Sequence, residues 1–236
     1  KMKKNTLILV VGSINADLIA YTSSASQRAN YAYGSDFELN LGGKSLNVAL
    51  TASTLTEEIA LISRVGKDIF GAEILDRLTR RGIVTQYIKI DQTAHTGVGH
   101  VRVDEYGQYD TFVINGANWN LEESDVDAFL ADGHEPRYVV FNFETDIRLL
   151  KKIIPTFKAL GSKIVVNFSP IVNDMRDLLS MVDIAVMNLE EAQQILNDVD
   201  KDPLLLLQRL KSLGPEAVVI TQGAGGAVAL GENGGL

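Results

Sequence analysis

The sequence has 236 residues, of which 46% are hydrophobic and 22% charged, and its formal net charge is −8. This composition is typical of an ordinary folded protein with material for one sizeable core, and it excludes a collagen-like, coiled-coil or wholly disordered chain. No apolar run approaches the roughly 20 residues of a membrane span, and no signal peptide is visible. The absence of cysteine excludes disulfides and thiolate metal sites and fits a cytoplasmic protein. Acidic and basic residues are interspersed, so we expect neither nucleic acid nor a membrane as a partner.

Short β-branched runs alternate with amphipathic stretches along most of the chain. We predict strands over 7–11, 59–65, 138–141, 163–167, 182–187 and 217–220, and helices over 45–55, 68–81, 146–160, 189–196 and 203–213. The helices 68–81 and 146–160 are followed by Gly82 and Gly161, which favours a left-handed C-cap. The alternation predicts an α/β fold in which helices cover both faces of a parallel sheet.

One part of the chain breaks this rhythm. Residues 96–103 and 109–114 partly alternate apolar and polar side chains around the polar turn 104–108, which predicts a half-exposed hairpin. The stretch 19–41 contains further aromatic and aliphatic residues that could add strands to it. We therefore expect a single α/β domain over 1–236 with a small β lid from about 16–41 and 96–114.

A polar hexapeptide, Gly12-Ser13-Ile14-Asn15-Ala16-Asp17, follows the first predicted strand. Ligands of open α/β sheets gather at the carboxyl ends of strands. If the chain stays extended there, Asn15 and Asp17 project in the same direction, and an amide beside a carboxylate can clamp vicinal sugar hydroxyls. An ordinary polar turn explains the hexapeptide equally well.

Paired glycines precede the first predicted helix, in Leu41-Gly42-Gly43-Lys44-Ser45-Leu46-Asn47. They allow the backbone to approach a ligand and leave helix N-terminal amides free for oxygen atoms, while Lys44 adds a positive charge. The spacing is not that of a Walker loop. On local grounds a simple turn is the more common meaning of such a pair.

The segment Asn188-Leu189-Glu190-Glu191 directly follows a predicted strand. A carboxylate faces the phosphates of ATP only with a cation between them, so a functional Glu191 implies Mg²⁺, reached through water. The alternative is a capping box, in which Asn188 is the N-cap and Glu191 reaches back to it. Local sequence favours the capping box.

The last predicted strand ends in Thr221-Gln222-Gly223-Ala224-Gly225-Gly226. Glycines and a hydroxyl at a strand end can form a backbone nest for triphosphate oxygens. A simple β-turn is an equal alternative.

Together and in this order, the four motifs resemble the ribokinase branch of the phosphofructokinase-B sugar kinases, from about Leu7 to the C-terminus. Three further features are similar to that family. They are Arg64-Val65-Gly66-Lys67-Asp68 with Gly71, then Gly116-Ala117-Asn118, and the strand-end Glu144. Each motif is weak alone, but the ordered set is specific.

The resemblance implies a three-layer α/β/α fold and transfer of the γ-phosphoryl group of ATP to a sugar hydroxyl, with ribose favoured. It implies that the sugar is held by Asn15, Asp17, Gly43, Lys44, Asn47 and Glu144. It also implies that Asn188, Thr221 and Gly223 face the nucleotide, that Glu191 organises Mg²⁺, and that a monovalent cation could be a further cofactor. The hairpin would be a lid that closes over the sugar and joins two protomers in a homodimer.

Two departures from the family pattern affect these expectations. Residues 26–31, Ser-Gln-Arg-Ala-Asn-Tyr, lack the proline and Gly-Glu that the family often has before a lid strand. The family's catalytic aspartate, which takes the proton of the attacking hydroxyl, is expected beyond Leu236. We therefore expect the complete protein to be active and the 236-residue segment alone to be inactive.

Other functions remain open at this point. A related kinase could act on fructose, a keto-deoxy sugar acid or a nucleoside, because a few hydrogen bonds decide between such acceptors. A non-catalytic homologue that binds sugar or nucleotide could share the same fold. A dinucleotide-dependent oxidoreductase is disfavoured, because Gly12-Ser13-Ile14-Asn15 is not a Gly-x-Gly-x-x-Gly turn.

Overall fold

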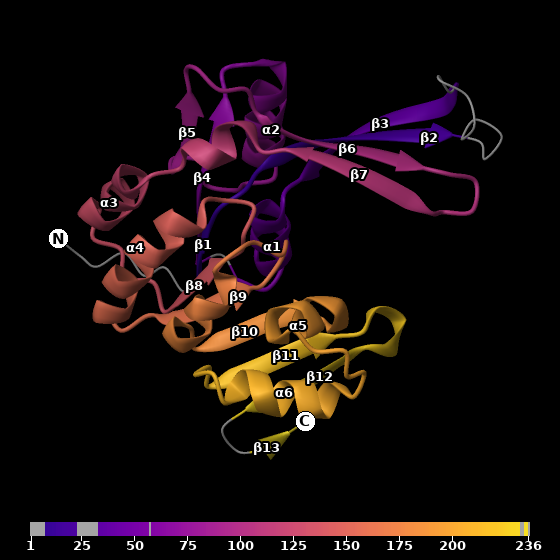
Figure 1. Ribbon diagram of the computed structural model, residues 1–236. Coiled ribbons are helices and arrows are strands. Elements are labelled where there is room, and N and C mark those ends of the chain that lie inside the picture. The colour runs from indigo at the N-terminus through magenta and orange to yellow at the C-terminus, as the bar shows by residue number, and fades with distance from the viewer. Residues whose placement is uncertain (1–7, 23–32, 57, 232–233, 236) are drawn as a thin grey trace.

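A nine-stranded sheet forms the body of the protein, and a separate four-stranded sheet projects from it (Figure 1). The computed structural model describes residues 8–22, 33–56, 58–231 and 234–235. Residue Leu7 and the whole segment 26–31, on which two expectations rest, lie outside the described residues.

The central strands of the larger sheet run parallel. In space the order is β13-β12-β11-β10-β9-β8-β1-β4-β5, and the strands from β11 to β5 are parallel to one another. At one side of the sheet, β12 and the edge strand β13 are antiparallel to their neighbours. Their bounds are β1 (Ile8–Val11), β4 (Ile59–Gly66), β5 (Ile88–Asp91), β8 (Tyr138–Phe141), β9 (Lys163–Asn167), β10 (Ile184–Asn188), β11 (Ala217–Thr221), β12 (Ala227–Gly231) and β13 (Gly234–Gly235).

Helices pack against both faces of this sheet, which makes three layers. Alternate residues of β1 show this arrangement: Leu9 and Val11 belong to one apolar cluster and Val10 to another. The larger cluster includes residues of α3 (Glu123–Ala131), α4 (Ile147–Ala159), α5 (Leu189–Leu196) and α6 (Pro203–Lys211). The smaller cluster includes residues of α1 (Lys44–Ala52) and α2 (Ile69–Arg80). Among the described residues, no helix is sufficiently long and apolar to span a membrane.

The smaller sheet has the order β3-β2-β6-β7, with bounds β2 (Asn15–Thr22), β3 (Gly34–Gly42), β6 (Gly97–Val103) and β7 (Tyr109–Ile114). Strand β2 leaves the body directly after the end of β1, and β3 returns to the start of α1. The 3-10 helix η2 (Gly116–Asn120) follows β7 and leads back into the body. The smaller sheet is thus joined to the body at the carboxyl end of β1 (Figure 1).

Candidate active site

The first sequence-predicted residues, Asn15 and Asp17, lie at the start of β2 and point to the same face of the smaller sheet because they are two residues apart. The predicted turn is therefore confined to residues 12–14, and the chain is extended from Asn15 onward. Glycines surround the Asp17 side chain on the two neighbouring strands. A Cβ atom would lie 2.2 Å from the Asp17 carboxylate at Gly42 and 2.4 Å from it at Gly99. Glycine at these two positions makes room for the carboxylate.

The Asp17 carboxyl group has a raised pKa. Partial burial and the nearby negative charge of Glu144 raise the pKa of Asp17 from 3.8 to about 6. The side chain comes from the smaller sheet, whereas Glu144 follows β8 in the larger sheet. The carboxyl groups of Asp17, in the smaller sheet, and Glu144, directly after β8, are therefore close enough to interact electrostatically.

Glu144 holds the start of helix α1. Its Oε2 atom accepts hydrogen bonds from the hydroxyl of Ser13 at 2.5 Å and from the backbone N–H of Lys44 at 2.9 Å. The N-cap residue Gly43 has φ +93° and no side chain to cap the helix. A Cβ there would lie 2.8 Å from the carbonyl oxygen of Ser13, so both the conformation and the close approach require glycine.

The side chains of Lys44 and Asn47 are available to a ligand. They lie three residues apart on the first turn of α1 and so share one side of the helix. Lys44 is half-buried and Asn47 is exposed. Neither side chain forms a hydrogen bond or ion pair with any residue that the structure describes.

Asn118 on η2 is the nearest polar partner of Asn15. Its side chain is buried and donates from Nδ2 to the Asn15 Oδ1 atom at 2.8 Å. Gly97, paired with Asn15 across β2 and β6, lies against this contact. A Cβ at Gly97 would be 2.2 Å from Asn15 Oδ1 and 2.4 Å from Asn118 Nδ2.

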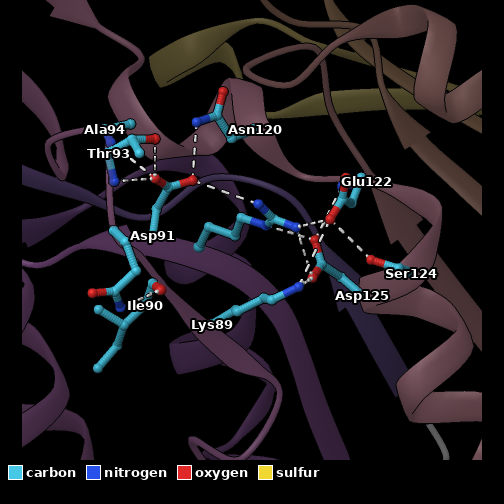
Figure 2. Close-up of polar contacts among 11 residues, drawn as sticks. Lys89, Ile90, Asp91, Thr93, Ala94, Asn120, Glu122, Ser124 and Asp125 are labelled. Carbon is cyan, nitrogen blue, oxygen red and sulfur yellow. Dashed lines mark hydrogen bonds and ion pairs between the residues drawn. The ribbon is translucent and has the colours of Figure 1, made fainter.

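A buried ion network lies at the other end of η2. Arg64 on β4 donates to Asp125 from Nε at 2.7 Å and to Glu122 from Nη2 at 2.5 Å, and its Nη1 lies 3.5 Å from Asp91. Figure 2 shows Asp91 directed toward Asn120, whose amide donates to it at 2.9 Å. The network therefore ties β4, β5, α3 and η2 together beside the sugar-site candidates.

The predicted nucleotide residues Asn188 and Glu191 form a capping box at the start of α5. The Asn188 side chain accepts from the Glu191 N–H at 2.8 Å, and the Glu191 carboxylate accepts from the Asn188 N–H at 2.8 Å. This is the structural alternative that the local sequence favoured. One carboxylate oxygen of Glu191 is engaged in the cap, and the second has no partner among the described residues.

Thr221 lies directly beside Asn188 in the register of β10 and β11. Its hydroxyl donates to the Met187 carbonyl at 3.4 Å. Gly223 follows with φ +57°, and Gly226 has φ +84°. Residues 222–227 are exposed, so the backbone of this glycine-rich turn is accessible from solvent.

All of these groups lie at the carboxyl ends of the parallel strands of the larger sheet, along the edge that these ends form. Because the central strands are parallel, the segments that follow β1, β8, β10 and β11 emerge on the same side. Four strand spacings separate β1 from β11, which corresponds to about 19 Å. The edge can therefore carry an elongated ligand, with Lys44 and Glu144 near one end and Asn188 and Thr221 near the other.

A model of the pfkB family carbohydrate kinases matches residues 5–236. The chain belongs to this family. Its fold and the order of its polar motifs along the sheet edge agree with that membership. The resemblance seen in the sequence is confirmed.

Several relatives of the chain bear the name ribokinase. The chain is 26% identical over 233 residues to a ribokinase of Mus musculus, covering 95% of this chain and 71% of that protein. It is 28% identical over 223 residues to a ribokinase of Haemophilus influenzae, covering 93% of this chain and 72% of that protein. A solved ribokinase structure from Giardia lamblia is 26% identical with a TM-score of 0.85, over 96% of this chain and 72% of that one.

Sequence reasoning singled out the charged and amide side chains of the site but not the residues that fix them. The glycines at 42, 97 and 99 act through the space they leave, and the sequence does not reveal which side chain fills that space. In the sequence, Asn118 stands out only as part of a family-like tripeptide. The turn formed by 116–118 returns to the body next to β2, which local sequence cannot show.

Proposed function

We propose that this chain binds the sugar and the nucleotide of an ATP-dependent sugar kinase, with ribose as the favoured acceptor. The observation that carries the proposal is the pairing of Asn15 and Asp17 on β2 with Lys44 and Glu144 at the same sheet edge. This set offers amide, carboxylate and ammonium groups to a small polyol. The names of the relatives favour ribose among such polyols.

In this proposal the sugar lies between the two sheets. Asp17 accepts hydrogen bonds from sugar hydroxyls, while Asn47 and Lys44 donate to sugar oxygens. Gly43 lets the backbone approach the sugar, and Glu144 positions the α1 N-terminus through the Lys44 amide. Closure of the smaller sheet as a lid would exclude water, which otherwise competes as phosphoryl acceptor.

The nucleotide would occupy the other end of the edge. Asn188 and Thr221 would contact it, and the glycines at 223 and 226 would offer backbone amides to phosphate oxygens. Among the described residues no group of three acidic or histidine side chains could hold a metal ion. The single free oxygen of Glu191 fits Mg²⁺ that is bound mainly by phosphates and water, in which role the ion would neutralise phosphate charge. A monovalent cation remains a proposed additional cofactor.

The smaller sheet also offers a surface for a second copy of the chain. The face that carries Asp17 continues outward over β2, β6 and β7 as a mainly apolar strip, with Thr111 within it and polar residues of β3 beside it. The apolar residues of this strip are Ile19, Tyr21, Val101, Val103, Tyr109 and Val113. Tyr109 is 74% exposed and Val113 48% exposed. Such a strip supports a homodimer formed through this face. A cytoplasmic location fits the absence of cysteine.

Calorimetric titration of the 236-residue chain with D-ribose, fructose, a keto-deoxy sugar acid and a nucleoside tests the acceptor, and titration with ATP and Mg²⁺ tests the nucleotide. We expect binding of ATP and tightest sugar binding for ribose. Tighter binding of another acceptor would reassign the substrate within the same family. A chain that binds nucleotide but none of the four acceptors would contradict the sugar site.

A further inference from the structure

The orientation of the Asn118 side-chain amide can be assigned from its backbone partners alone. The backbone N–H of Ile14 can only donate, and it lies 2.9 Å from one terminal atom of Asn118, which must therefore be Oδ1. The backbone carbonyl of Ile14 can only accept, and it lies 3.1 Å from the other terminal atom, which must be Nδ2. Both contacts give the same orientation.

This assignment decides the orientation of Asn15 as well. Asn118 Nδ2 lies 2.8 Å from the facing side-chain atom of Asn15, and because Nδ2 can only donate, that atom must be the acceptor Oδ1. The amide nitrogen of Asn15 then points away from Asn118. It forms no hydrogen bond with the residues that the structure describes. This orientation directs the Asn15 amide nitrogen away from Asn118, to where a ligand could accept from it.

The surroundings prevent the pair from rearranging easily. Asn118 is 1% exposed and Asn15 is 3% exposed. Gly97 presses its backbone against the contact, since even a Cβ there would lie within 2.4 Å of both amides. The Asn15 side chain also shares its face of β2 with Asp17.

We infer that Asn118 is a positioning residue that turns Asn15 so that residue 15 presents a hydrogen-bond donor to the sugar. This inference rests on the proposed sugar site. Asn15 then donates a hydrogen bond to a sugar oxygen, while Asp17 accepts one from a sugar hydroxyl. The two side chains therefore bind adjacent hydroxyl groups, one as donor and the other as acceptor. A ligand that offers an acceptor next to a donor satisfies both side chains.

The substitution Asn118→Asp tests the inference because it preserves the shape of the side chain and replaces the donor Nδ2 by an acceptor oxygen. Aspartate can still accept from the Ile14 N–H, but it can no longer donate to the Ile14 carbonyl or to Asn15, so the Asn15 amide is expected to turn its nitrogen toward residue 118. We expect D-ribose affinity to fall by about tenfold or more, with ATP affinity unchanged. The matched control is Asn115→Asp, the same change beside the same 3-10 helix, where the side chain caps nothing. It should leave both affinities unchanged.

A double-mutant cycle separates positioning from general damage to the fold. If Asn118 acts through Asn15, then Asn118→Asp should cause no further loss of ribose affinity in an Asn15→Ala background. Additive losses, or wild-type affinity in Asn118→Asp, would overturn the inference.

Failure of the proposed function is distinguished by a measurement without ligand. Proton exchange of side-chain amides, followed by NMR, should be slow for Asn118 and fast for Asn15 in the wild-type chain. It should become slow for Asn15 in Asn118→Asp. If the chain binds no sugar but shows this reversal, the sugar assignment fails and the positioning holds. Slow exchange at Asn15 in the wild type would refute the positioning itself.

Discussion

Ionisation of the Asp17 carboxyl group destabilises the folded chain relative to the unfolded chain. Burial and Glu144 raise its pKa to about 6, so the folded chain holds this proton more tightly than the unfolded chain does. Ionisation therefore opposes folding, and the stability linked to Asp17 decreases as pH rises from the unfolded value of 3.8 to about 6. Retention of such a group is typical of a functional site.

We predict that Asp17→Asn increases the free energy of unfolding by about 1 kcal/mol at about pH 7, a value reduced for solvent screening. The gain should nearly vanish at about pH 3.5, where the wild-type carboxyl is mostly protonated in both states. Urea denaturation at the two pH values measures this difference. A variant that is less stable than wild type at neutral pH would show that the carboxylate stabilises the fold instead.

The same group predicts the pH dependence of sugar binding. Ribose affinity should decrease as pH falls through about 6, because protonated Asp17 loses an acceptor position. In Asp17→Asn the affinity should be low at all pH values and nearly independent of pH. Calorimetry across this range gives both curves. An affinity that is constant for the wild type would argue against direct contact between Asp17 and the sugar.

Arg64 gives a prediction about stability rather than binding. It is 7% exposed and faces two buried carboxylates, those of Asp91 and Asp125. Hydrogen bonds from the Ala94 N–H and the Asn120 amide, among others, hold the pKa of Asp91 well below its usual range. We expect Arg64→Met to destabilise the chain by about 3–5 kcal/mol, because Asp91 loses its counter-charge and Asp125 keeps only Lys89 as a cationic partner among the described residues. The control Arg80→Met, which breaks an exposed pair with Asp76, should change stability by less than about 1 kcal/mol. Similar denaturation midpoints for the two variants would contradict this assignment.

At the scale of elements, the start of α5 has two interpretations that one substitution separates. Asn188 and Glu191 form a capping box, and glutamine can replace glutamate in such a cap. We therefore predict that Glu191→Gln keeps the thermal stability within about 0.5 kcal/mol of wild type and weakens the Mg²⁺ dependence of ATP binding. Asn188→Ala, which removes the cap, should cost about 1 kcal/mol. Unchanged Mg²⁺ dependence in Glu191→Gln would leave Glu191 with the capping role alone.

The elements that the sequence predicted are those with strong local patterns. The strands 138–141 and 163–167 and the helix 189–196 have the expected bounds, and α2 lies one residue inside its predicted range at each end. Helix α3 was not predicted, because it is only nine residues long and its first half carries the three acidic residues Glu123, Asp125 and Asp127. Its place depends on Arg64, a residue about 60 positions earlier that binds the N3 residue Asp125. The short strands β5, at one edge of the sheet, and β12, next to the other edge, were likewise missed, since short strands near a sheet edge have weak patterns.

The residues of the site also fall into two groups, those that the sequence indicates and those that only the folded chain reveals. Asn15, Asp17, Lys44 and Glu144 carry chemical groups that a sequence displays, and the parallel order of the strands brings them to one edge. The spaces at Gly42 and Gly99 are set by strand pairing over distances of about 25 and 82 residues from Asp17. A linear pattern contains no register, so these partners could be found only in the folded chain.

At the scale of the whole molecule, the apolar strip on the Asp17 face predicts self-association. Tyr109→Asp places a charge in the strip and should convert a dimer to a monomer, because burying that charge is unfavourable. The control is Phe112→Asp on the same strand, which points to the opposite face and is 70% exposed. It should leave the dimer intact. Sedimentation velocity distinguishes these outcomes, and a monomeric wild type would refute the proposed interface.

The placement of two carboxylates on separate sheets has a mechanical consequence. Asp17 belongs to the projecting sheet and Glu144 to the body. Without a ligand, the repulsion between their charges therefore pushes the smaller sheet away from the body. A polyol that donates to Asp17 removes part of this repulsion and bridges the gap. Protonation of Asp17 should have the same effect as the polyol, because it removes the repulsion between Asp17 and Glu144. Mild acid alone is thus expected to let the unliganded molecule contract, a change that small-angle scattering would register as a smaller radius of gyration.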